Sequence, residues 1–496
     1  MTEQRPNIVF ILNDHQAYYR HGWDGGVRPQ TPNYDRLAAG GVHFDRSYCA
    51  APLCGPTRRT LLTGLFPHNH KQHHNYTDPP YDHEVYLNLL SDQGYRNFYY
   101  GKWHAGPGSA LDHNCEGFSY HDYGNPYITP EYGDYLERYD LPPAEHLIER
   151  VFTVEGFDEM FPKLKVGEKY RCEANWCGEH AIGVTTTPKE THESFFLANL
   201  ACEKLTKLSQ STDDNPFHLR VDFWGPHQPH FPTKEFTDLY NPEEIEVYGN
   251  FNSDLKNKPA RYHRERNHPI SKDDQIIFPN PLPWEEWQKV LARAYAHISM
   301  VDAAGGMILD KLEELGLAEN TVVLWALDHG DGVACHGGHF DKSSYMPEEM
   351  VRTYLALRYP GQVKAGRVLP HLISHVDIPP TILDLAGTQF NETVDGTSLL
   401  DICKDENTDW REDLLVETFG HGWGDEDLGK MIVTDQYKFI ANEGQMNELY
   451  DLDADPYELD NLIDNPDFKE VQKNMIERLV VWMADTGDKA DINDLL

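Results

Sequence analysis

The sequence predicts an α/β fold in which a large, mostly parallel β-sheet is flanked by helices, with a small domain after it. Residues 7–12 form a continuous apolar run, typical of a strand buried on both faces of a parallel sheet. Strand and helix patterns then alternate along most of the chain, as they do in α/β sandwiches. After about residue 400, short strands follow one another instead, which predicts a short antiparallel sheet and a terminal helix.

The elements of the large domain follow from these patterns in chain order. A helix is expected to begin at Thr31 and Pro32 and to end at Gly40, because proline suits the first turn of a helix and glycine its end. Two segments are rich in proline, glycine or polar residues and are expected to be loop-rich insertions. The remaining expectations are helices at 84–93, 193–208 and 284–315, strands at 96–100, 218–224, 321–327 and 353–358, and insertions at about 106–190 and 232–283.

The C-terminal part is expected to form a separate α+β subdomain. A chain of 496 residues exceeds what one hydrophobic core usually organises. The predicted division is therefore an α/β domain over residues 1–400 and a subdomain over residues 401–496. The subdomain is expected to contain strands at 413–419, 430–434 and 437–441 and a helix at 468–484.

Composition limits the classes of partner. A formal net charge of −38 argues against nucleic acid or an anionic membrane. No apolar run is long enough to span a bilayer. The eight cysteines show no regular framework, so mostly free thiols are expected. No signal-peptide pattern precedes residues 7–12, which favours a cytoplasmic location, while a mature secreted or periplasmic form and a homo-oligomer stay open.

The segment from Cys54 to Gly64 has the features of a functional helix. Pro56 suits the first helical turn, and Gly64 is placed to end the helix. Cys54 would then lie at the N-terminus, where the helix dipole favours an anion and lowers the pKa of a thiol. Arg58 lies one turn further on the same face and has forked donors for an oxyanion. A buried free cysteine before a helix is the alternative, and these residues alone do not decide between the two.

A metal site is predicted where two strands end. Asp14 follows the strand at 7–12, and Asp328 and His329 follow the strand at 321–327. Open α/β sheets place their ligands at the carboxyl ends of parallel strands. Carboxylates that converge there repel one another unless a cation lies between them.

These motifs together resemble those of the type I sulfatases, which belong to the alkaline phosphatase superfamily. The resemblance rests on Cys-Gly-Pro-Thr-Arg at 54–58 and on Gly-Lys-Trp-His at 101–104, and it extends from residue 7 to the last helix. It also includes Pro-His-Gln-Pro at 226–229 and Lys342. It implies an alkaline-phosphatase-like sandwich, and a maturation enzyme that oxidises Cys54 to formylglycine. The aldehyde hydrate of formylglycine would attack the sulfur of a sulfate ester.

The resemblance also assigns the metal ligands. One divalent ion would be held by Asp14, the modified Cys54, Asp328 and His329. The family generally uses Ca²⁺, whereas the nitrogen of His329 suits Mn²⁺ better, and Mg²⁺ also stays open. Many sulfatases carry a second acidic residue where this chain has His15, so His15 is left undecided as a ligand.

Four basic residues receive catalytic roles from the same resemblance, in addition to Arg58. Lys102 would hold a sulfate oxygen, and His104 would act as the base on the second hydroxyl of the hydrate. His227 would face the leaving-group oxygen, and Lys342 would also contact the ester. Expulsion of an alcohol needs a proton, which His227 or Lys342 would supply.

The function predicted from the sequence is hydrolysis of a sulfate monoester of a carbohydrate or another small organic alcohol. A phosphonate monoester or phosphodiester hydrolase of the same superfamily is the alternative, and Lys102 with His104 favours sulfate over it. A metal-binding or sugar-binding protein without activity is a further alternative, which applies if Cys54 is not oxidised.

Overall fold

The structure is a computed structural model of the 496-residue chain. It describes residues 5–18, 26–120, 125–152, 163–174, 177–178, 180–266, 270–272, 275–277, 282–342, 345–421 and 428–496.

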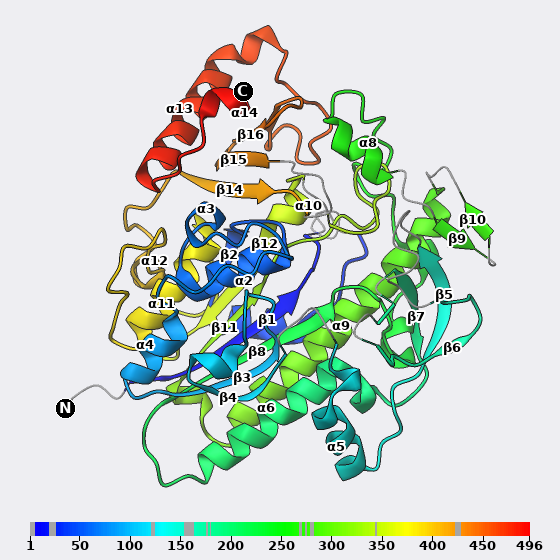
Figure 1. Ribbon diagram of the computed structural model, residues 1–496, viewed down its shortest axis with the longest axis vertical. Helices are drawn as coiled ribbons and strands as arrows, with labels where there is room; N and C mark the ends of the chain where they lie inside the picture. Colours follow the sequence, from blue (N-terminus) through cyan, green and yellow to red (C-terminus); the bar gives the residue numbers. More distant parts are fainter. Residues whose placement is uncertain are drawn as a thin grey trace.

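An eight-stranded sheet forms the centre of the molecule (Figure 1). Strand β1 (Asn7–Asp14) pairs in parallel with β11 (Thr321–Leu327) and with β8 (Phe217–Pro226). Beyond β8 lie β3 (Arg96–Lys102) and β4 (Cys115–Tyr120), also parallel. On the other side lie β12 (Arg352–Arg358), β2 (Val42–Tyr48) and β13 (Arg367–Ser374), and only β12 runs antiparallel to its neighbours. The prediction of a large, mostly parallel sheet is confirmed.

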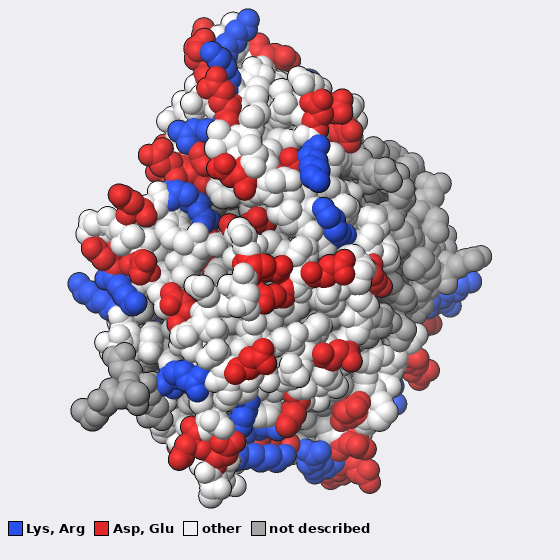
Figure 2. Space-filling view, turned by 60° about the vertical axis from the view of Figure 1, so that its left-hand side comes forward, with Lys and Arg blue, Asp and Glu red and all other residues white. Residues whose placement is uncertain are grey.

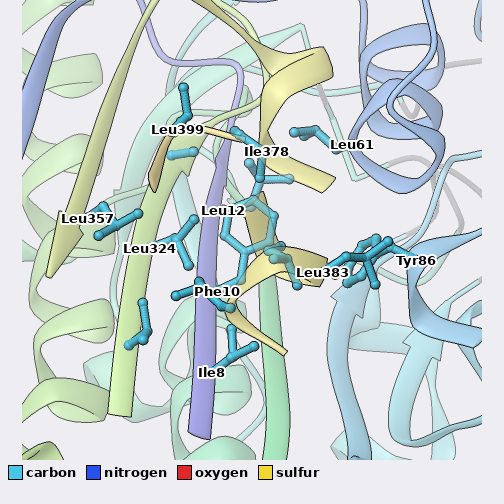
Figure 3. Packing of buried hydrophobic residues seen from close by; sticks show 14 of the residues in the cluster. Ile8, Phe10, Leu12, Leu61, Tyr86, Leu324, Leu357, Ile378, Leu383 and Leu399 are labelled. Carbon is cyan, nitrogen blue, oxygen red and sulfur yellow. The ribbon is translucent and has the colours of Figure 1, made fainter. Parts of the chain in front are cut away.

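Helices cover both faces of this sheet. Ile8, Phe10 and Leu12 of β1 point to one face, where they pack with α2 (Cys54–Thr63), α4 (Tyr86–Asp92) and α11 (Ile378–Leu385) (Figure 3). Val9 and Ile11 point to the other face, which α1 (Pro32–Ala39), α6 (Glu193–Ser209) and α9 (Trp284–Glu314) cover. Because successive side chains of a strand alternate between faces, a strand covered on both sides must be apolar throughout. This explains the continuous apolar run at residues 7–12.

The start of α1 shows a cap that the sequence pattern does not reveal. Thr31 is the N-cap residue, but its side chain makes no capping hydrogen bond. The Asp302 carboxylate, from α9, accepts hydrogen bonds from the backbone N–H groups of Asn33 and Tyr34 instead. The orphan donors of the first turn are thus satisfied by a residue far away in the sequence.

The segments expected to be loop-rich contain a second sheet. Strand β5 (His146–Phe152) pairs antiparallel with β6 (Lys169–Tyr170), β7 (Ala181–Thr185) and β9 (Ile270–Lys272), and β9 pairs with β10 (Gln275–Ile277). Helix α5 (Pro130–Tyr139) lies in the same region. Strand β5 mixes charged and apolar residues, and β6 is only two residues long, so neither produces a clear pattern.

A four-stranded antiparallel sheet follows the large domain, as predicted. Strands β14 (Asp413–Phe419), β15 (Leu428–Thr434), β16 (Tyr437–Asn442) and β17 (Glu448–Asp451) form a meander. Helix α13 (Lys469–Asp485) packs on it (Figure 1). The division of the chain at residue 400 stays a prediction.

The surface carries the net charge in dispersed form. Figure 2 shows Asp and Glu side chains scattered over the face it presents, with Lys and Arg side chains between them. Of the helices that the structure describes, none has the length and apolar character needed to cross a membrane.

Candidate active site

The signature segment forms α2, and its position buries the whole helix. Cys54 is the first helical residue, and Gly64 ends the helix with a φ of 70°. That φ lies in the left-handed region, which glycine adopts without strain. Every residue of α2 is buried, including Arg58. The helix therefore runs under the surface and points its N-terminus at the ends of β1 and β11.

Four potential metal ligands meet at this N-terminus. The ligand atoms of Asp14, Cys54, Asp328 and His329 all lie within 4.8 Å of one another. Cys54 Sγ is 3.6 Å from Asp14 Oδ1 and 3.1 Å from His329 Nε2. His329 Nδ1 lies 2.8 Å from the Gly330 carbonyl oxygen, so Nδ1 carries the proton and Nε2 has its lone pair directed at the group.

The electrostatics of this group fit a divalent cation. Burial and the Asp14 carboxylate raise the pKa of Asp328 to about 7. Burial also opposes ionisation of Asp14, but Lys102 and Arg58 hold the pKa of Asp14 well below its usual range. Two buried carboxylates, a sulfur and an unprotonated imidazole nitrogen form a donor set that a divalent ion would stabilise.

The expected lowering of the thiol pKa of Cys54 is wrong. Burial and the neighbouring Asp14 raise the pKa of Cys54, and they outweigh the opposing charges of Lys102 and Lys342. The dipole of a ten-residue helix is a weaker influence than desolvation plus an adjacent carboxylate.

Arg58 connects the carboxylates around the site. Its Nε lies 3.0 Å from Asp328 Oδ2, and its Nη1 lies 3.0 Å from Asp222 Oδ2. Its Nη2 is 3.6 Å from Asp14 Oδ2. Most of its donors therefore bind protein oxygens, so Arg58 is better placed to hold these carboxylates than to bind an oxyanion with its full fork.

Lys102 and His104 lie on the segment that leaves β3. Lys102 is fully buried, and its ammonium group donates a hydrogen bond to Asp14. His104 is buried and has a φ of 47°, an unusual backbone conformation for a histidine. Burial and the charge of Lys102 lower the pKa of His104 well below its usual range, so the imidazole is neutral and can accept a proton.

Lys342 and His227 form a hydrogen-bonded pair near the same group. Lys342 Nζ lies 3.0 Å from His227 Nε2, while His227 Nδ1 lies 2.6 Å from the Gln228 carbonyl oxygen. Nδ1 therefore carries the imidazole proton, and Nε2 accepts from the lysine. Burial alone would lower the pKa of Lys342, but Asp341 raises it above its usual range.

His15 lies beside the metal-ligand group but is not part of it. Among the residues that the structure describes, the group at this site consists of the four named above and does not include His15. His15 Nε2 lies 3.3 Å from Asp331 Oδ1 and 3.4 Å from Asp341 Oδ1. Its ring centroid is 4.5 Å from that of His227.

Three carboxylates near the site were missed by sequence reasoning. Asp222 lies in a fully buried strand that also contains His218 and Arg220, and charged residues inside such a strand were a usable signal. Asp331 and Asp341 lie next to residues already singled out, but nothing in their spacing shows that both face His15. Burial and Asp341 raise the pKa of Asp331 to about 7.

The fold and this constellation define a class: hydrolases of the alkaline phosphatase superfamily that have an α/β sandwich and a ligand group at the ends of parallel strands. Comparison with known families is specific. The family model described as "Sulfatase" matches residues 6–388, and that of the N-sulphoglucosamine sulphohydrolase C-terminal region matches residues 335–485. The chain therefore belongs to the sulfatase family, a family of sulfuric ester hydrolases, and the predicted resemblance is confirmed.

Similar proteins cover nearly the whole chain. An N-acetylglucosamine-6-O-sulfatase of Bacteroides thetaiotaomicron is 26% identical over 494 residues, covering 96% of this chain and 86% of its own length. An arylsulfatase of Clostridium perfringens is 28% identical over 472 residues, covering 94% of this chain and 92% of its own length.

Solved structures share the fold. One, in complex with its substrate D-glucosamine-2-N,6-O-disulfate, has a TM-score of 0.73 at 21% identity and covers 98% of this chain and 99% of its own. A phosphonate monoester hydrolase of Agrobacterium radiobacter has a TM-score of 0.74 at 20% identity, covering 97% of this chain and 96% of its own. These similarities confirm the predicted fold.

Proposed function

We propose that the protein hydrolyses a sulfate monoester of a carbohydrate, with Cys54 as the modified nucleophilic residue. The observation that carries the proposal is the convergence of Asp14, Cys54, Asp328 and His329 within 4.8 Å, beside buried basic side chains. The names of two relatives support the substrate class, since one is an N-acetylglucosamine-6-O-sulfatase and another an ulvan-active sulfatase.

Asp14, residue 54, Asp328 and His329 would hold one divalent ion, with Ca²⁺ as the first candidate and Mn²⁺ or Mg²⁺ as alternatives. When bound, the metal would offset the charge of the sulfate and favour ionisation of a hydroxyl group on residue 54. Oxidation of Cys54 to formylglycine by a maturation enzyme would provide that hydroxyl as an aldehyde hydrate.

The chain's own basic residues would divide the remaining work. Lys102, already fixed on Asp14, is placed to neutralise a sulfate oxygen. His104 is neutral and would accept a proton from residue 54. Lys342 holds a proton and donates to the unprotonated nitrogen of His227, so the pair would deliver that proton to the leaving oxygen. Arg58 would fix the carboxylates that surround the metal.

One substrate panel tests the reaction class. The purified protein, expressed with a maturation system, is assayed on matched aryl sulfate, sugar sulfate, phosphonate monoester and phosphodiester substrates. We expect the highest kcat/KM on the sulfates. A preference for the phosphonate would move the protein to the alternative function, for which the Asp328–His329 pair is the motivating feature.

The modification of residue 54 has a direct test. Mass spectrometry of the tryptic peptide over residues 47–58 should show conversion of Cys54, with Cys49 as the unmodified internal control. Full activity with an unoxidised Cys54 would refute the proposed nucleophile. If neither modification nor turnover is found, the binding-protein alternative applies. The cytoplasmic location and the oligomeric state stay predictions.

A further inference from the structure

A second group of potential metal ligands lies beneath the loop that carries His227. His192 is the N-cap of α6, Glu193 is its first residue, and His297 lies within α9. One ligand atom from each of the three lies within 4.8 Å of the other two. All three residues are buried, with 3%, 4% and 2% of their surface exposed. The group connects two helices that pack side by side under the sheet (Figure 1).

The potential ligand atoms of these side chains lie close together. His192 Nδ1 lies 3.7 Å from Glu193 Oε1, and it accepts a long hydrogen bond of 3.3 Å from the Ser194 N–H, so it is an unprotonated nitrogen. A metal ion bound at Nδ1 would replace this hydrogen bond. In the part of the chain that the structure describes, His297 Nε2 and Glu193 Oε2 are buried and have no hydrogen-bond partner. Buried polar atoms of this kind call for an explanation.

Gly225 packs tightly against two of these side chains. A Cβ atom placed on Gly225 would lie 2.6 Å from Val301 Cγ2, 2.9 Å from His297 Nε2 and 3.2 Å from Glu193 Oε1. Any larger residue would therefore press on both ligand atoms. Gly225 is two residues before His227, so the group lies against the backbone that leads to this side chain.

Among the described residues, no lysine or arginine forms an ion pair with Glu193. Two other groups of potential metal ligands in the described residues each contact a lysine. Lys430 contacts Glu417 and Asp488 of the group that includes His68, and Lys438 contacts Glu458 of the group that includes His336 and Glu349. The only ion-pair partner described for Glu193 is His192. Burial raises the pKa of Glu193 to about 7, although hydrogen bonds from Ser194 and from nearby backbone N–H groups oppose this.

We propose that His192, Glu193 and His297 bind a second divalent transition-metal ion, separate from the ion proposed at Asp14 and Asp328. Two imidazole nitrogens and one carboxylate oxygen are a ligand set that Zn²⁺ accepts, whereas Ca²⁺ prefers oxygen ligands alone. The ion would place a positive charge beside the uncompensated carboxylate. It would join α6 to α9 and hold the Gly225 backbone, which is a structural role.

Metal content of the full-length protein tests this proposal. The Asp328→Ala variant, which lacks a ligand of the first site, is stripped with a chelator and dialysed against Zn²⁺ alone. We expect about one zinc per chain in this variant, and none once Glu193→Gln or His297→Ala is added. Loading with Co²⁺ gives an independent readout, because its visible spectrum reports nitrogen and oxygen ligands.

Matched controls keep the outcome interpretable. His218→Gln removes another buried histidine, one that contacts Tyr86 and lies outside the group, and should leave the zinc of Asp328→Ala unchanged. Glu193→Gln preserves the shape of the side chain. If circular dichroism shows that His297→Ala does not fold, Glu193→Gln alone tests the site. Absence of zinc from a folded Asp328→Ala variant, or zinc that persists after both group substitutions, would overturn the proposal.

Discussion

Replacement of Lys342 should affect poor leaving groups more than good ones. Lys342 carries its proton and donates to His227 Nε2 across 3.0 Å. The other ring nitrogen of His227 faces a backbone carbonyl oxygen, so the imidazole has no second proton to give. The proton for an alcohol leaving group should therefore originate on Lys342, with His227 orienting it. A nitrophenolate leaves without such help, whereas a sugar alkoxide does not.

The magnitude follows from the two roles of the ammonium group. A hydrogen bond to a charged group contributes about 1.5–3 kcal/mol, so its loss lowers kcat/KM by roughly 10-fold to 150-fold on any sulfate ester. Proton donation to the leaving group contributes a further factor of roughly 10²–10⁴, felt only with a poor leaving group. Lys342→Met should therefore lose roughly 10³-fold or more on a sugar sulfate and much less on an aryl sulfate.

The assay compares kcat/KM of Lys342→Met and the wild type on a nitrophenyl sulfate and a sugar sulfate. Lys258→Met is the control, because Lys258 is another buried lysine but contacts Tyr450 at 2.6 Å, in the C-terminal sheet. Any loss in this control measures the effect of removing a buried lysine in general. Equal losses of Lys342→Met on both substrates would refute its role as proton donor.

Three further predictions concern buried charges. Asp222→Asn removes one of the carboxylates that pair with Arg58, and it should lower the free energy of unfolding by about 3–5 kcal/mol. Thermal unfolding measures this loss, and an unchanged melting curve would contradict it. His15→Gln should keep the metal content measured by elemental analysis, because His15 lies outside the ligand group, and loss of the metal would make it a ligand after all. Burial alone would raise the pKa of Glu417, but Lys430 holds this pKa far below its usual range. The ionised Glu417 therefore stabilises the fold above the unfolded pKa of about 4.3, and this stabilisation is lost as the pH falls through the folded pKa. Glu417→Gln should therefore cost about 3–5 kcal/mol at neutral pH and less in acid, whereas a pH-independent difference in unfolding free energy would contradict the ion pair.

The central strands were predictable because burial on both faces imposes a strong pattern. The apolar run at residues 7–12 is typical of a doubly covered strand, and the structure extends that strand to Asp14. Strand β2 was missed because the polar run Asp45-Arg46-Ser47 interrupts its alternation of apolar and polar residues. The second sheet was missed because β6, β9 and β10 are only two or three residues long, and because the β5–β9 pairing joins segments more than a hundred residues apart. Local patterns carry no information on such partners.

The ligand group was predictable because Asp14, Asp328 and His329 lie at the ends of two predicted strands and Cys54 begins a predicted helix. The contacts that hold these residues were not predictable. That Asp14 and Asp328 should meet follows from parallel pairing of their strands. Asp222 could be noticed as a charged residue in a buried strand, yet its pairing with Arg58 depends on the position of α2 over the sheet. The error on the Cys54 pKa has the same origin, since desolvation depends on how deeply α2 is buried.

The buried charges explain how a chain with a net charge of −38 can act on an anionic ester. Its acidic surface gives no long-range attraction for sulfate, so binding must rely on short-range contacts within the site. There the carboxylates formally outnumber the cations, with Asp14, Asp222, Asp328, Asp331 and Asp341 around Arg58, Arg220, Lys102 and Lys342. The basic side chains are thus largely neutralised by the protein itself. A divalent ion between Asp14 and Asp328 is the addition that would make this site net positive, so sulfate affinity should depend on the metal more than on any single lysine.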